Sequence, residues 1–275
     1  MNPPEELYPR DESNPLADLD ARVAGCAACP RLVAWREEVG RVKRAAFMDW
    51  TYWARPVPGF GPPDASMLVI GLAPAAHGGN RTGRMFTGDR SGDVLYKAMY
   101  ELGLASSPLA VSVDDGLTLR GVRVTSPVHC APPENKPTPA ERDTCRPWLV
   151  REMELLGPRL RSAVILGAFG WQAALPAFAA AGWRVPKPRP RFAHGTRVTL
   201  ERAATQEPGG VSAAAAAPGE SGPGPVTLYG CFHVSQRNTF TGRLTPDMLK
   251  DVLREAAGEA DIPPYVPAPG QRPQT

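Results

Sequence analysis

Short apolar runs alternate with amphipathic stretches through the middle of the chain. The first is the short apolar run SMLVIG at 66–71, and the other strand candidates are VRVTS at 122–126, SAVILG at 162–167 and VTLYGCF at 226–232. Continuous apolar runs of this length are typical of strands that are buried on both faces of a parallel sheet. The pattern therefore predicts four buried strands.

Stretches with a helical spacing of apolar residues follow these runs. We predict helices over 91–103, 139–157, 168–182 and 245–257. Ser91 is the expected N-cap of the first helix and Gly103 its stop, and Pro176 is expected to bend or divide the third. Strands that alternate with helices of this length favour an α/β fold, a three-layer α/β/α sandwich around a central, mainly parallel four-stranded sheet.

Three segments lack the apolar periodicity of an ordered element. Residues 1–20 and 259–275 are predicted to be flexible tails, because they offer no apolar face whose burial would offset the entropy of ordering. Residues 201–225 hold a run of alanines between glycines and prolines, which predicts a low-complexity surface insertion. We expect a single domain over 21–258 that contains this insertion.

Two basic stretches lie outside the alternating pattern. The stretch 31–56 is expected to form a long basic helix that ends in aromatic residues. The stretch 184–197 contains five Lys and Arg residues and no acid, and its prolines keep it extended. This second stretch is either a solvated connection or, if it faces a cleft, a segment that follows a phosphate backbone.

Composition narrows the class of protein. Of the 275 residues 43% are hydrophobic, which excludes wholesale disorder, and the net charge of +3 does not by itself indicate a nucleic-acid partner. No run approaches the roughly 18 consecutive apolar residues of a membrane-spanning helix. The acidic, Pro-rich beginning of the chain does not have the pattern of a secretory signal. We expect a cytoplasmic, monomeric protein with no membrane partner.

Four of the five cysteines have the spacing of a metal or cluster site. Cys26 and Cys29 form a C-x-x-C pair, and Cys130 and Cys145 follow at long range, separated by fourteen residues. By ligand type four thiolates suit an iron–sulfur cluster or a tetrahedral zinc ion equally well, but the wide second spacing favours a cluster. Cys231 falls inside a predicted strand and is expected to be a buried apolar residue.

Polar, Gly/Pro-rich loops follow three of the predicted strands. Their sequences are GLAPAAHGGNRTGRMFTGD at 71–89, SPVHCAPPENKPTP at 126–139 and HVSQRNTFTGRLTP at 233–246. Parallel strands place such loops together at their carboxyl ends, so we expect one shared cleft. The first loop has neither a GxxxxGK[ST] nor a GxGxxG pattern, which counts against nucleotide hydrolysis and dinucleotide redox chemistry.

These residues resemble a known family. The sequences GLAPAAHGGNRTGRMFTGD and HVSQRNTFTGRLT, together with the four cysteines, closely resemble the iron–sulfur uracil-DNA glycosylases, most closely the type-5 branch of bacteria and archaea. The resemblance spans about residues 22–257 apart from the insertion. It implies an α/β/α fold, a [4Fe–4S] cluster bound by the four cysteines, and excision of uracil and other deaminated bases, such as hypoxanthine and xanthine, from DNA. The protein would then begin base excision repair at the nucleoid.

Two residues are candidates for catalysis. We expect His233 to donate a hydrogen bond to a carbonyl of the base, which would spread the charge of the leaving group; the alternative is a structural histidine. Many uracil glycosylases position water with an acidic or amide side chain early in the first motif, where this chain has Ala73. The type-5 branch shares this departure. Asp89 is therefore our candidate for orienting water and stabilising the sugar cation, its alternative role being to cap the following helix.

The extruded base needs a stacking partner and a group that reads its edge. By resemblance Phe86 supplies the stacking face; the alternative is a core phenylalanine under the loop. Asn135 is a candidate for reading the base edge, because an amide matches the donor–acceptor pattern of uracil, and its alternative role is to hold a turn. Gly71, Ala73 and Asn80 are expected to line the same pocket.

The HVSQRN loop resembles the segment that this family inserts into the minor groove. The expected DNA contacts are Ser235, Gln236, Arg237, Asn238 and Arg243. Two other classes of function stay open at this point. One is an iron–sulfur electron carrier, although the chain has no motif for a flavin, a nucleotide or a second cluster, and the other is a nucleic-acid-binding module without catalysis.

Overall fold

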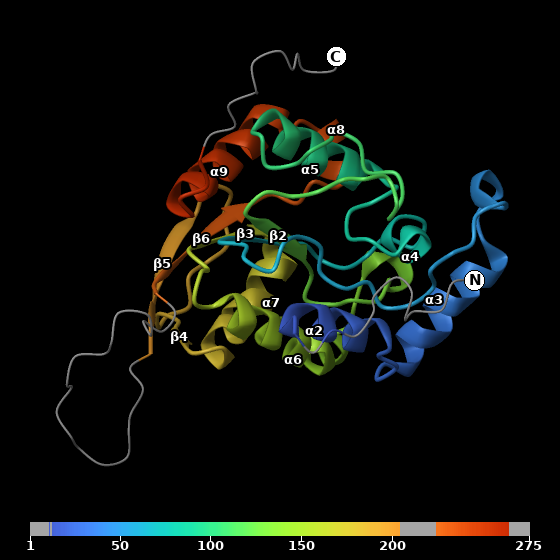
Figure 1. Ribbon diagram of the computed structural model, residues 1–275, viewed down its shortest axis with the longest axis horizontal. Helices are drawn as coiled ribbons and strands as arrows, with labels where there is room; N and C mark the ends of the chain where they lie inside the picture. Colours follow the sequence, from blue (N-terminus) through green and yellow to red (C-terminus); the bar gives the residue numbers. More distant parts are fainter. Residues whose placement is uncertain (1–10, 12, 204–223, 264–275) are drawn as a thin grey trace.

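A six-stranded mixed sheet forms the middle layer of the fold (Figure 1). The computed structural model describes residues 11, 13–203 and 224–263. The strands are β1 (Met67–Ile70), β2 (Val122–Thr125), β3 (Ser162–Leu166), β4 (Trp183–Arg184), β5 (Arg197–Arg202) and β6 (Val226–Cys231). Their order is β2-β1-β3-β6-β5-β4, in which the first four are parallel, β5 runs antiparallel to β6, and β4 runs antiparallel to β5.

Helices cover both faces of the sheet (Figure 1). Helices α5 (Arg90–Glu101) and α9 (Pro246–Glu259) pack on one face, and α2 (Pro15–Ala24), α6 (Pro139–Leu156) and α7 (Gly167–Ala180) pack on the other. The other helical segments are α3 (Pro30–Val42), η1 (Ala45–Phe47), α4 (Gly79–Thr82), η2 (Pro133–Asn135) and α8 (Gln236–Phe240).

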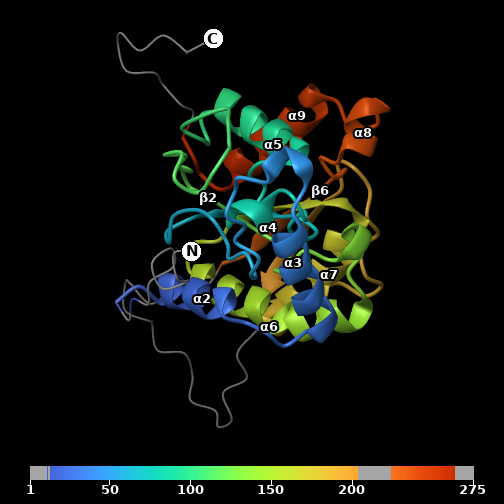
Figure 2. The same cartoon turned by 90° about the vertical axis from the view of Figure 1, so that its right-hand side faces the viewer.

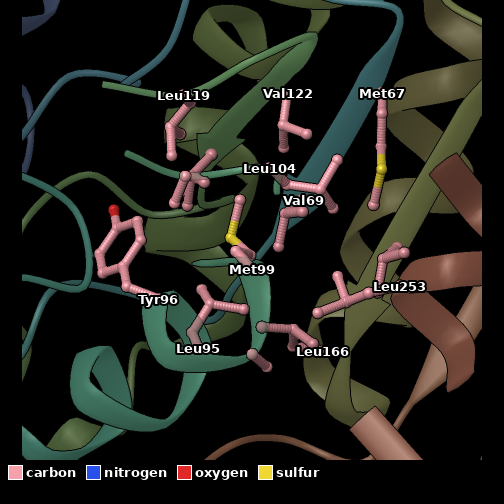
Figure 3. Packing of buried hydrophobic residues seen from close by; sticks show 14 of the residues in the cluster. Met67, Val69, Leu95, Tyr96, Met99, Leu104, Leu119, Val122, Leu166 and Leu253 are labelled. Carbon is pink, nitrogen blue, oxygen red and sulfur yellow. The ribbon is translucent and has the colours of Figure 1, made fainter. Parts of the chain in front are cut away.

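Strand β1 divides the two cores. Its side chains alternate between the faces, so Met67 and Val69 belong to the core under α5 and α9, while Leu68 and Ile70 belong to the core under α2, α6 and α7. All four side chains are fully buried. Figure 3 shows the first core, where Met99 of α5 packs against Val69. The prediction of strands buried on both faces is therefore confirmed.

The predicted α/β sandwich and its four parallel strands are confirmed, but the prediction of four strands in total is wrong. The two missed strands, β4 and β5, form the antiparallel edge of the sheet. In β5 the exposed Arg197 and Thr199 alternate with the partly buried Val198 and the buried Leu200. Such one-sided alternation is the pattern of a strand with a single buried face, and it lies where the sequence is rich in Pro and charge.

The N-terminal boundary of the domain lies earlier than residue 20, so the prediction of a tail over 1–20 is wrong for its last residues. Helix α2 begins at Pro15, where the side chain of Asn14 accepts a hydrogen bond from the backbone of Ala17 at 3.3 Å. Leu16 and Leu19 are buried against α6 and α7. Two apolar residues were too few to indicate this face within an acidic, Pro-rich stretch.

The prediction of one long helix over 31–56 is also wrong. Helix α3 ends at Val42, because Lys43 adopts a positive φ of 60° that breaks the helical path. The short η1 follows, and beyond it Tyr52 and Trp53 are buried in irregular chain. The aromatic residues therefore belong to a separate segment that packs on the domain.

The remaining elements follow the predictions closely. Helix α9 begins at Pro246 after the N-cap Thr245. Helix α7 runs without a break through Pro176, so the helix that was expected to bend or divide there is not divided. The expected insertion begins inside β5, and its part at 204–223 lies outside the described residues. Residues 264–275 also lie outside them, whereas Ile262 is buried against Gly121, so the tail predicted from 259 starts too early. Among the described helices none is long and apolar enough to cross a membrane.

Candidate functional site

The carboxyl ends of the four parallel strands meet at one edge of the sheet. Ile70 at the end of β1 is level with Thr125 of β2 and Ile165 of β3, and Leu166 of β3 is level with Cys231 of β6. The segment after β1 leads directly into α4, which lies beside α3 in Figure 2. The three polar loops therefore begin at one edge of the sheet, and the shared cleft stays a prediction.

Phe86 lies over the end of β1, in space left free by two glycines that have no side chain. A Cβ at Gly71 would lie 2.7 Å from Cζ of the Phe86 ring, and a Cβ at Gly92 would lie 1.8 Å from the Phe86 carbonyl oxygen. The backbone of Phe86 has a φ of 51°, which is unusual for a bulky residue. Such strain persists only where the surroundings enforce it, as is typical of functional sites. The ring is only partly buried, so part of it faces outward.

His233 lies next to Phe86. The two ring centroids are 6.2 Å apart and the ring planes are tilted by 33°. Burial lowers the pKa of His233 to about 4, so its imidazole is neutral at neutral pH. Its carbonyl oxygen accepts a hydrogen bond from Asn238 Nδ2 at 2.8 Å, and its Cβ would be 3.2 Å from a Cβ at Gly167. Its ring nitrogens make no hydrogen bond to the described residues, so the N–H is available to a ligand.

Asp89 caps α5 with one carboxylate oxygen. Its Oδ1 accepts hydrogen bonds from Ser91 N at 2.8 Å and Gly92 N at 3.1 Å. Asp89, and not Ser91 as predicted, is therefore the N-cap residue. Its Oδ2 makes no hydrogen bond within the described residues and lies over Gly78. Burial raises the pKa of Asp89, while the two backbone N–H groups act in the opposite direction. Capping thus leaves one oxygen free.

Asn80 and Arg81 connect the first loop to its surroundings. Asn80 is fully buried, and its Nδ2 donates to the carbonyl oxygen of Arg36 on α3 at 3.2 Å. Arg81 is 3% exposed and donates to the carbonyl oxygens of His77 and Gly88, each at 2.8 Å. Both side chains therefore bind the backbone of the protein, and the role of Asn80 in lining a base pocket stays a prediction.

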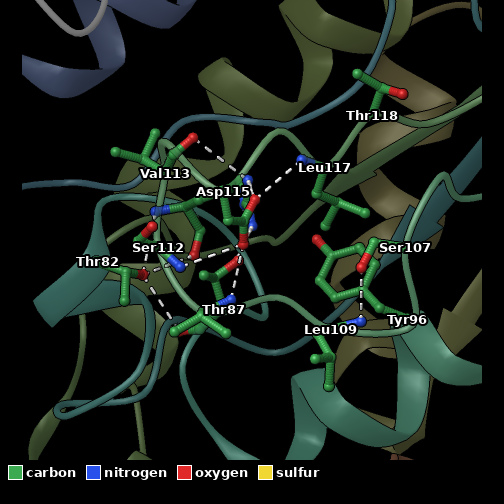
Figure 4. Close-up of polar contacts among 12 residues, drawn as sticks. Thr82, Thr87, Tyr96, Ser107, Leu109, Ser112, Val113, Asp115, Leu117 and Thr118 are labelled. Atoms are coloured by element: carbon green, nitrogen blue, oxygen red, sulfur yellow. Dashed lines mark hydrogen bonds and ion pairs between the residues drawn. The ribbon is translucent and has the colours of Figure 1, made fainter.

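An ion pair between a buried arginine and a partly exposed aspartate fixes the part of the loop that carries Phe86. Arg84 is 2% exposed; its Nη2 is 2.6 Å from Asp115 Oδ2, and its Nε donates to Thr87 Oγ1 at 2.9 Å. Asp115 also accepts hydrogen bonds from the backbone amides of Val111 and Leu117, and Figure 4 shows the contact with Leu117. Burial would raise the pKa of Asp115, but the hydrogen bonds from Arg84 and from these amides lower it to about 2.

Two of the predicted base-binding residues have contacts of other kinds. Ala73 packs against the buried cluster of Leu32, Val128 and Cys130, beside the cysteines. Asn135 is exposed at the end of η2 and has a φ of 55°, a conformation typical of a turn. Its reading of a base edge stays a prediction.

The loop after β6 has both anchored and free side chains. Asn238 is anchored to His233, as described above, and the guanidinium of Arg243 lies over the ring of Phe232 at 4.5 Å. Gln236 and Arg237, on α8 after the N-cap Ser235, are exposed. Phe240, at the end of α8, is 68% exposed. The exposed side chains are therefore free to contact DNA.

The basic segment 184–197 runs beside the same strand end. Its His194 ring stacks on Phe232 with a centroid distance of 5.0 Å, and His194 Nδ1 is 3.3 Å from Phe232 N. Trp171 of α7 donates from Nε1 to the carbonyl oxygen of Pro190 at 2.8 Å. Phe232 immediately precedes His233, so this segment adjoins the candidate site.

Four cysteines line one cavity near α3. Cys26 and Cys29 come from the turn between α2 and α3, Cys130 from the loop after β2, and Cys145 from α6. Burial raises the pKa of the Cys130 thiol to about 11 and that of Cys145 to about 12. Two N–H groups reach the sulfurs: Arg36 Nη1 donates to Cys130 Sγ at 2.9 Å, and the backbone amide of His129 donates to Cys145 Sγ at 3.4 Å.

The fifth cysteine is separate from this cavity. Cys231 is fully buried in β6 and belongs to the core under α5 and α9, as the sequence predicts. Among the described residues no three His, Cys, Asp or Glu side chains converge closely enough to hold a single metal ion.

Sequence comparison connects this geometry with a family. The chain matches the uracil DNA glycosylase superfamily over residues 58–257. The protein belongs to the uracil-DNA glycosylase superfamily. It is 52% identical to a type-5 uracil-DNA glycosylase of Mycobacterium tuberculosis over 247 residues, which cover 90% of this chain and 82% of the relative. The type-5 enzyme of Thermus thermophilus is 47% identical over 234 residues (85% and 93%), and that of Pyrobaculum aerophilum 43% identical over 243 residues (88% and 92%).

Several residues that shape the site of this uracil-DNA glycosylase superfamily member do not stand out in its sequence. Arg84 and Asp115 are paired across 31 positions, and Arg36 reaches Cys130 across 94 positions. The sequence shows Gly78 and Gly92 only as small residues of a loop and a helix, and it does not indicate that other groups pack closely against them. A charged residue inside a Gly-rich loop was the one available signal for Arg84.

Proposed function

We propose that the protein is a uracil-DNA glycosylase that hydrolyses the N-glycosidic bond of uracil in DNA and so begins base excision repair. The relatives named type-5 uracil-DNA glycosylase support this function. The structural observation that carries the proposal is the pair of rings at the carboxyl edge of the sheet, Phe86 and His233, 6.2 Å apart and held by glycines. An aromatic face and a hydrogen-bond donor side by side are what an extruded pyrimidine requires.

In this proposal the base stacks on Phe86 and accepts a hydrogen bond from His233. When the bond between the base nitrogen and the sugar carbon breaks, its electron pair leaves with the base, and negative charge develops on the carbonyl oxygens. A neutral imidazole N–H aimed at one of these oxygens stabilises that charge more in the transition state than in the ground state. The lowered pKa of His233 keeps the imidazole neutral for this purpose.

Asp89 is proposed to act on the sugar side. Its Oδ1 is fixed by the first turn of α5, and its Oδ2 is free to accept a hydrogen bond from the attacking water. A carboxylate at this place also stabilises the positive charge of the oxocarbenium-like sugar. Capping the helix and orienting the water are therefore compatible roles, because each uses a different oxygen.

DNA is proposed to lie across the strand ends. Gln236 and Arg237 extend from α8, and the exposed Arg189 and Arg191 lie on the basic segment that is stacked against Phe232. Arg side chains placed in this way contact phosphates and the bases next to the lesion. Asn238 and Ser235 position the loop, and Arg243 reaches DNA with its edge while its face rests on Phe232.

Removal of hypoxanthine and xanthine is a further part of the proposal. By the resemblance, Ser126 at the end of β2 stands where some members of the wider superfamily carry the asparagine that reads the base. Its hydroxyl donates to the carbonyl oxygen of Val128 at 2.8 Å. A hydroxyl already bonded within the protein discriminates less between bases than an amide that requires one donor–acceptor pattern. The proposed site thus depends on stacking and on His233, which several deaminated bases satisfy.

The four cysteines are proposed to bind a [4Fe–4S] cluster. Thiolates spaced around a cavity suit a cluster in which each cysteine binds a different iron. The two N–H groups that reach Cys130 and Cys145 suit the hydrogen bonds that cluster ligands receive. When bound, the cluster would supply a covalent link between the α2–α3 turn, the loop after β2 and α6. This role is structural.

The test is excision from a duplex that carries one U·G pair, followed by heating with alkali. The parent protein is expected to leave an alkali-labile abasic site, and His233→Ala is expected to excise at least about 100-fold more slowly with unchanged cluster absorbance. Equal rates would remove His233 from the mechanism. No strand cleavage by the parent on uracil, hypoxanthine or xanthine substrates, with the cluster intact, would reject the glycosylase; DNA binding alone or redox activity would then favour one of the two other classes.

A further inference from the structure

Arg36 is a buried cation without a carboxylate partner. It lies on α3, is 5% exposed, and lines the same cavity as the four cysteines. Its Nη1 donates to Cys130 Sγ at 2.9 Å and to the carbonyl oxygen of Cys26 at 3.1 Å. Its Nε is buried without a hydrogen-bond partner in the described part of the chain, and no described carboxylate forms an ion pair with it.

Three other arginines of the described chain are buried, and each has a partner for its charge. Arg81 makes no ion pair, but its guanidinium lies 4.0 Å over the rings of Phe47 and Trp50. Arg84 is paired with Asp115, and Arg123 is paired with both Asp20 and Glu152. A guanidinium cannot release its proton in a protein, and an uncompensated charge at this depth is strongly unfavourable. Negative charge in the neighbouring cavity would therefore stabilise the guanidinium of Arg36 in this position.

We infer that Arg36 is the counter-cation of the centre that the four cysteines hold. This inference rests on the proposed cluster, which carries net negative charge when four thiolates bind it. The guanidinium positions Cys130 through a charge-assisted hydrogen bond and balances part of the charge of the centre. Its fixed positive charge favours the more negative, reduced state of the cluster over the oxidised state.

Arg36 also connects the cluster cavity with the catalytic loop. Its carbonyl oxygen accepts the hydrogen bond from Asn80 in the GGNRTG stretch. The side chain of Arg36 therefore acts on the cysteines, whereas its backbone holds the loop that leads to Phe86. A substitution of the side chain leaves the backbone contact in place, so an effect on the cluster can be separated from an effect on the loop.

The experiment compares the anaerobically purified parent with Arg36→Gln and Arg36→Lys, and uses Arg41→Gln, an exposed position on the same helix, as the control. The readouts are iron and sulfide content, the rate at which cluster absorbance is lost in air, and the midpoint potential. We expect Arg36→Gln to lose its cluster several-fold faster and to have a lower midpoint potential. Arg36→Lys, which keeps the charge but not the fork geometry, is expected to keep the potential near that of the parent and to lose its cluster at an intermediate rate.

The outcomes separate this inference from the cluster proposal. Iron and sulfide in the parent, with unchanged potential and cluster lifetime in Arg36→Gln, would overturn the role of Arg36 alone. A folded parent that binds no iron under anaerobic conditions would overturn both. If Arg36→Gln does not fold, the test depends on Arg36→Lys, which retains the positive charge. A midpoint potential of Arg36→Lys that is lowered as much as the loss of a full charge would lower it would then contradict the inference.

Discussion

The carboxylate of Asp89 lies directly over Gly78, so closely that a Cβ at Gly78 would be 2.0 Å from Oδ2. Gly78 is the residue before α4, and Asp89 is the residue before α5. The absence of a side chain at the first position thus makes room for the free oxygen of the second. This packing connects the middle of the first motif with its end.

Gly78→Ala is expected to displace the Asp89 carboxylate and to slow excision at least about tenfold, because a shift of about 1 Å in a reacting group is costly. The measurement is the single-turnover rate on a U·G duplex. Gly258→Ala is the control, since a Cβ at that position meets no other atom within 4 Å. An excision rate of Gly78→Ala equal to that of the parent would show that excision does not depend on the position of Asp89 Oδ2.

The variant Asp89→Asn distinguishes the role of Asp89 as a helix cap from the role of its negative charge. Asparagine caps helices about as well as aspartate, so this variant is expected to keep its melting temperature within the error of the measurement. It lacks the carboxylate charge that would stabilise the sugar cation, and its excision rate is expected to fall by about 100-fold or more. Asp89→Ala should lose activity and, in addition, about 1 kcal/mol of stability. A fully active Asp89→Asn would reduce Asp89 to a cap.

The pKa of His233 predicts how stability depends on pH. Its folded-state pKa of about 4 lies below the unfolded value of about 6.5, so the unfolded state binds the proton first as pH falls. The contribution of His233 is therefore complete above pH 6.5 and is lost between pH 6.5 and 4, by up to about 3 kcal/mol. Urea unfolding at pH 7.5 and pH 5 should show a smaller loss for His233→Gln than for the parent. Equal losses would contradict a neutral, buried His233.

The sequence could predict the parallel half of this fold because β1, β3 and β6 are largely apolar on both faces. In β2 the valines alternate with Arg123 and Thr125, and Arg123 is buried through its ion pairs with Asp20 and Glu152. The antiparallel β4 and β5 were missed because an edge strand with one buried face needs few apolar residues, and those of β5 lie among Arg, Thr and Glu. Helix α2 was missed for a similar reason: its buried face depends on a docking partner, α6, which is more than 100 positions away in the chain.

The residues of the site also fall into two groups, those that the sequence indicates and those that only the structure reveals. Phe86, Asp89 and His233 are in motifs of recognisable composition, and the structure places them at one edge of the sheet. Their supports are different in kind. The pairing of Arg84 with Asp115 and of Asn80 with Arg36 depends on tertiary packing, and no local spacing indicates it. Helix capping by Asp89 was foreseen as an alternative, but only the structure assigns it to one oxygen.

Asp115→Asn is expected to destabilise the protein by about 3 kcal/mol, because it leaves the guanidinium of Arg84 buried without its counter-charge. The loop with Phe86 should loosen, and excision should slow in parallel. The control is Asp114→Asn, at the exposed neighbouring position. The double variant Asp115→Asn with Arg84→Met removes the unpaired charge and should recover part of the stability. Equal unfolding curves for the parent and Asp115→Asn would contradict the importance of the ion pair.

Arg189→Glu combined with Arg191→Glu tests whether the basic segment lies along DNA. Each phosphate contact that is lost should lower the slope of log affinity against log salt concentration by roughly 0.9. Two lost contacts therefore predict weaker binding at low salt and a difference from the parent that shrinks as salt is added. Arg151→Glu, at an exposed position of α6 outside the basic segment, is the control. The single-turnover rate at saturating protein should not change, because neither arginine belongs to the ring pair, Phe86 and His233, that is proposed to hold the base. An unchanged salt slope would make the segment a solvated connection, and a lowered saturating rate would mean that it also positions the loop of His233 through the stacking of His194 on Phe232.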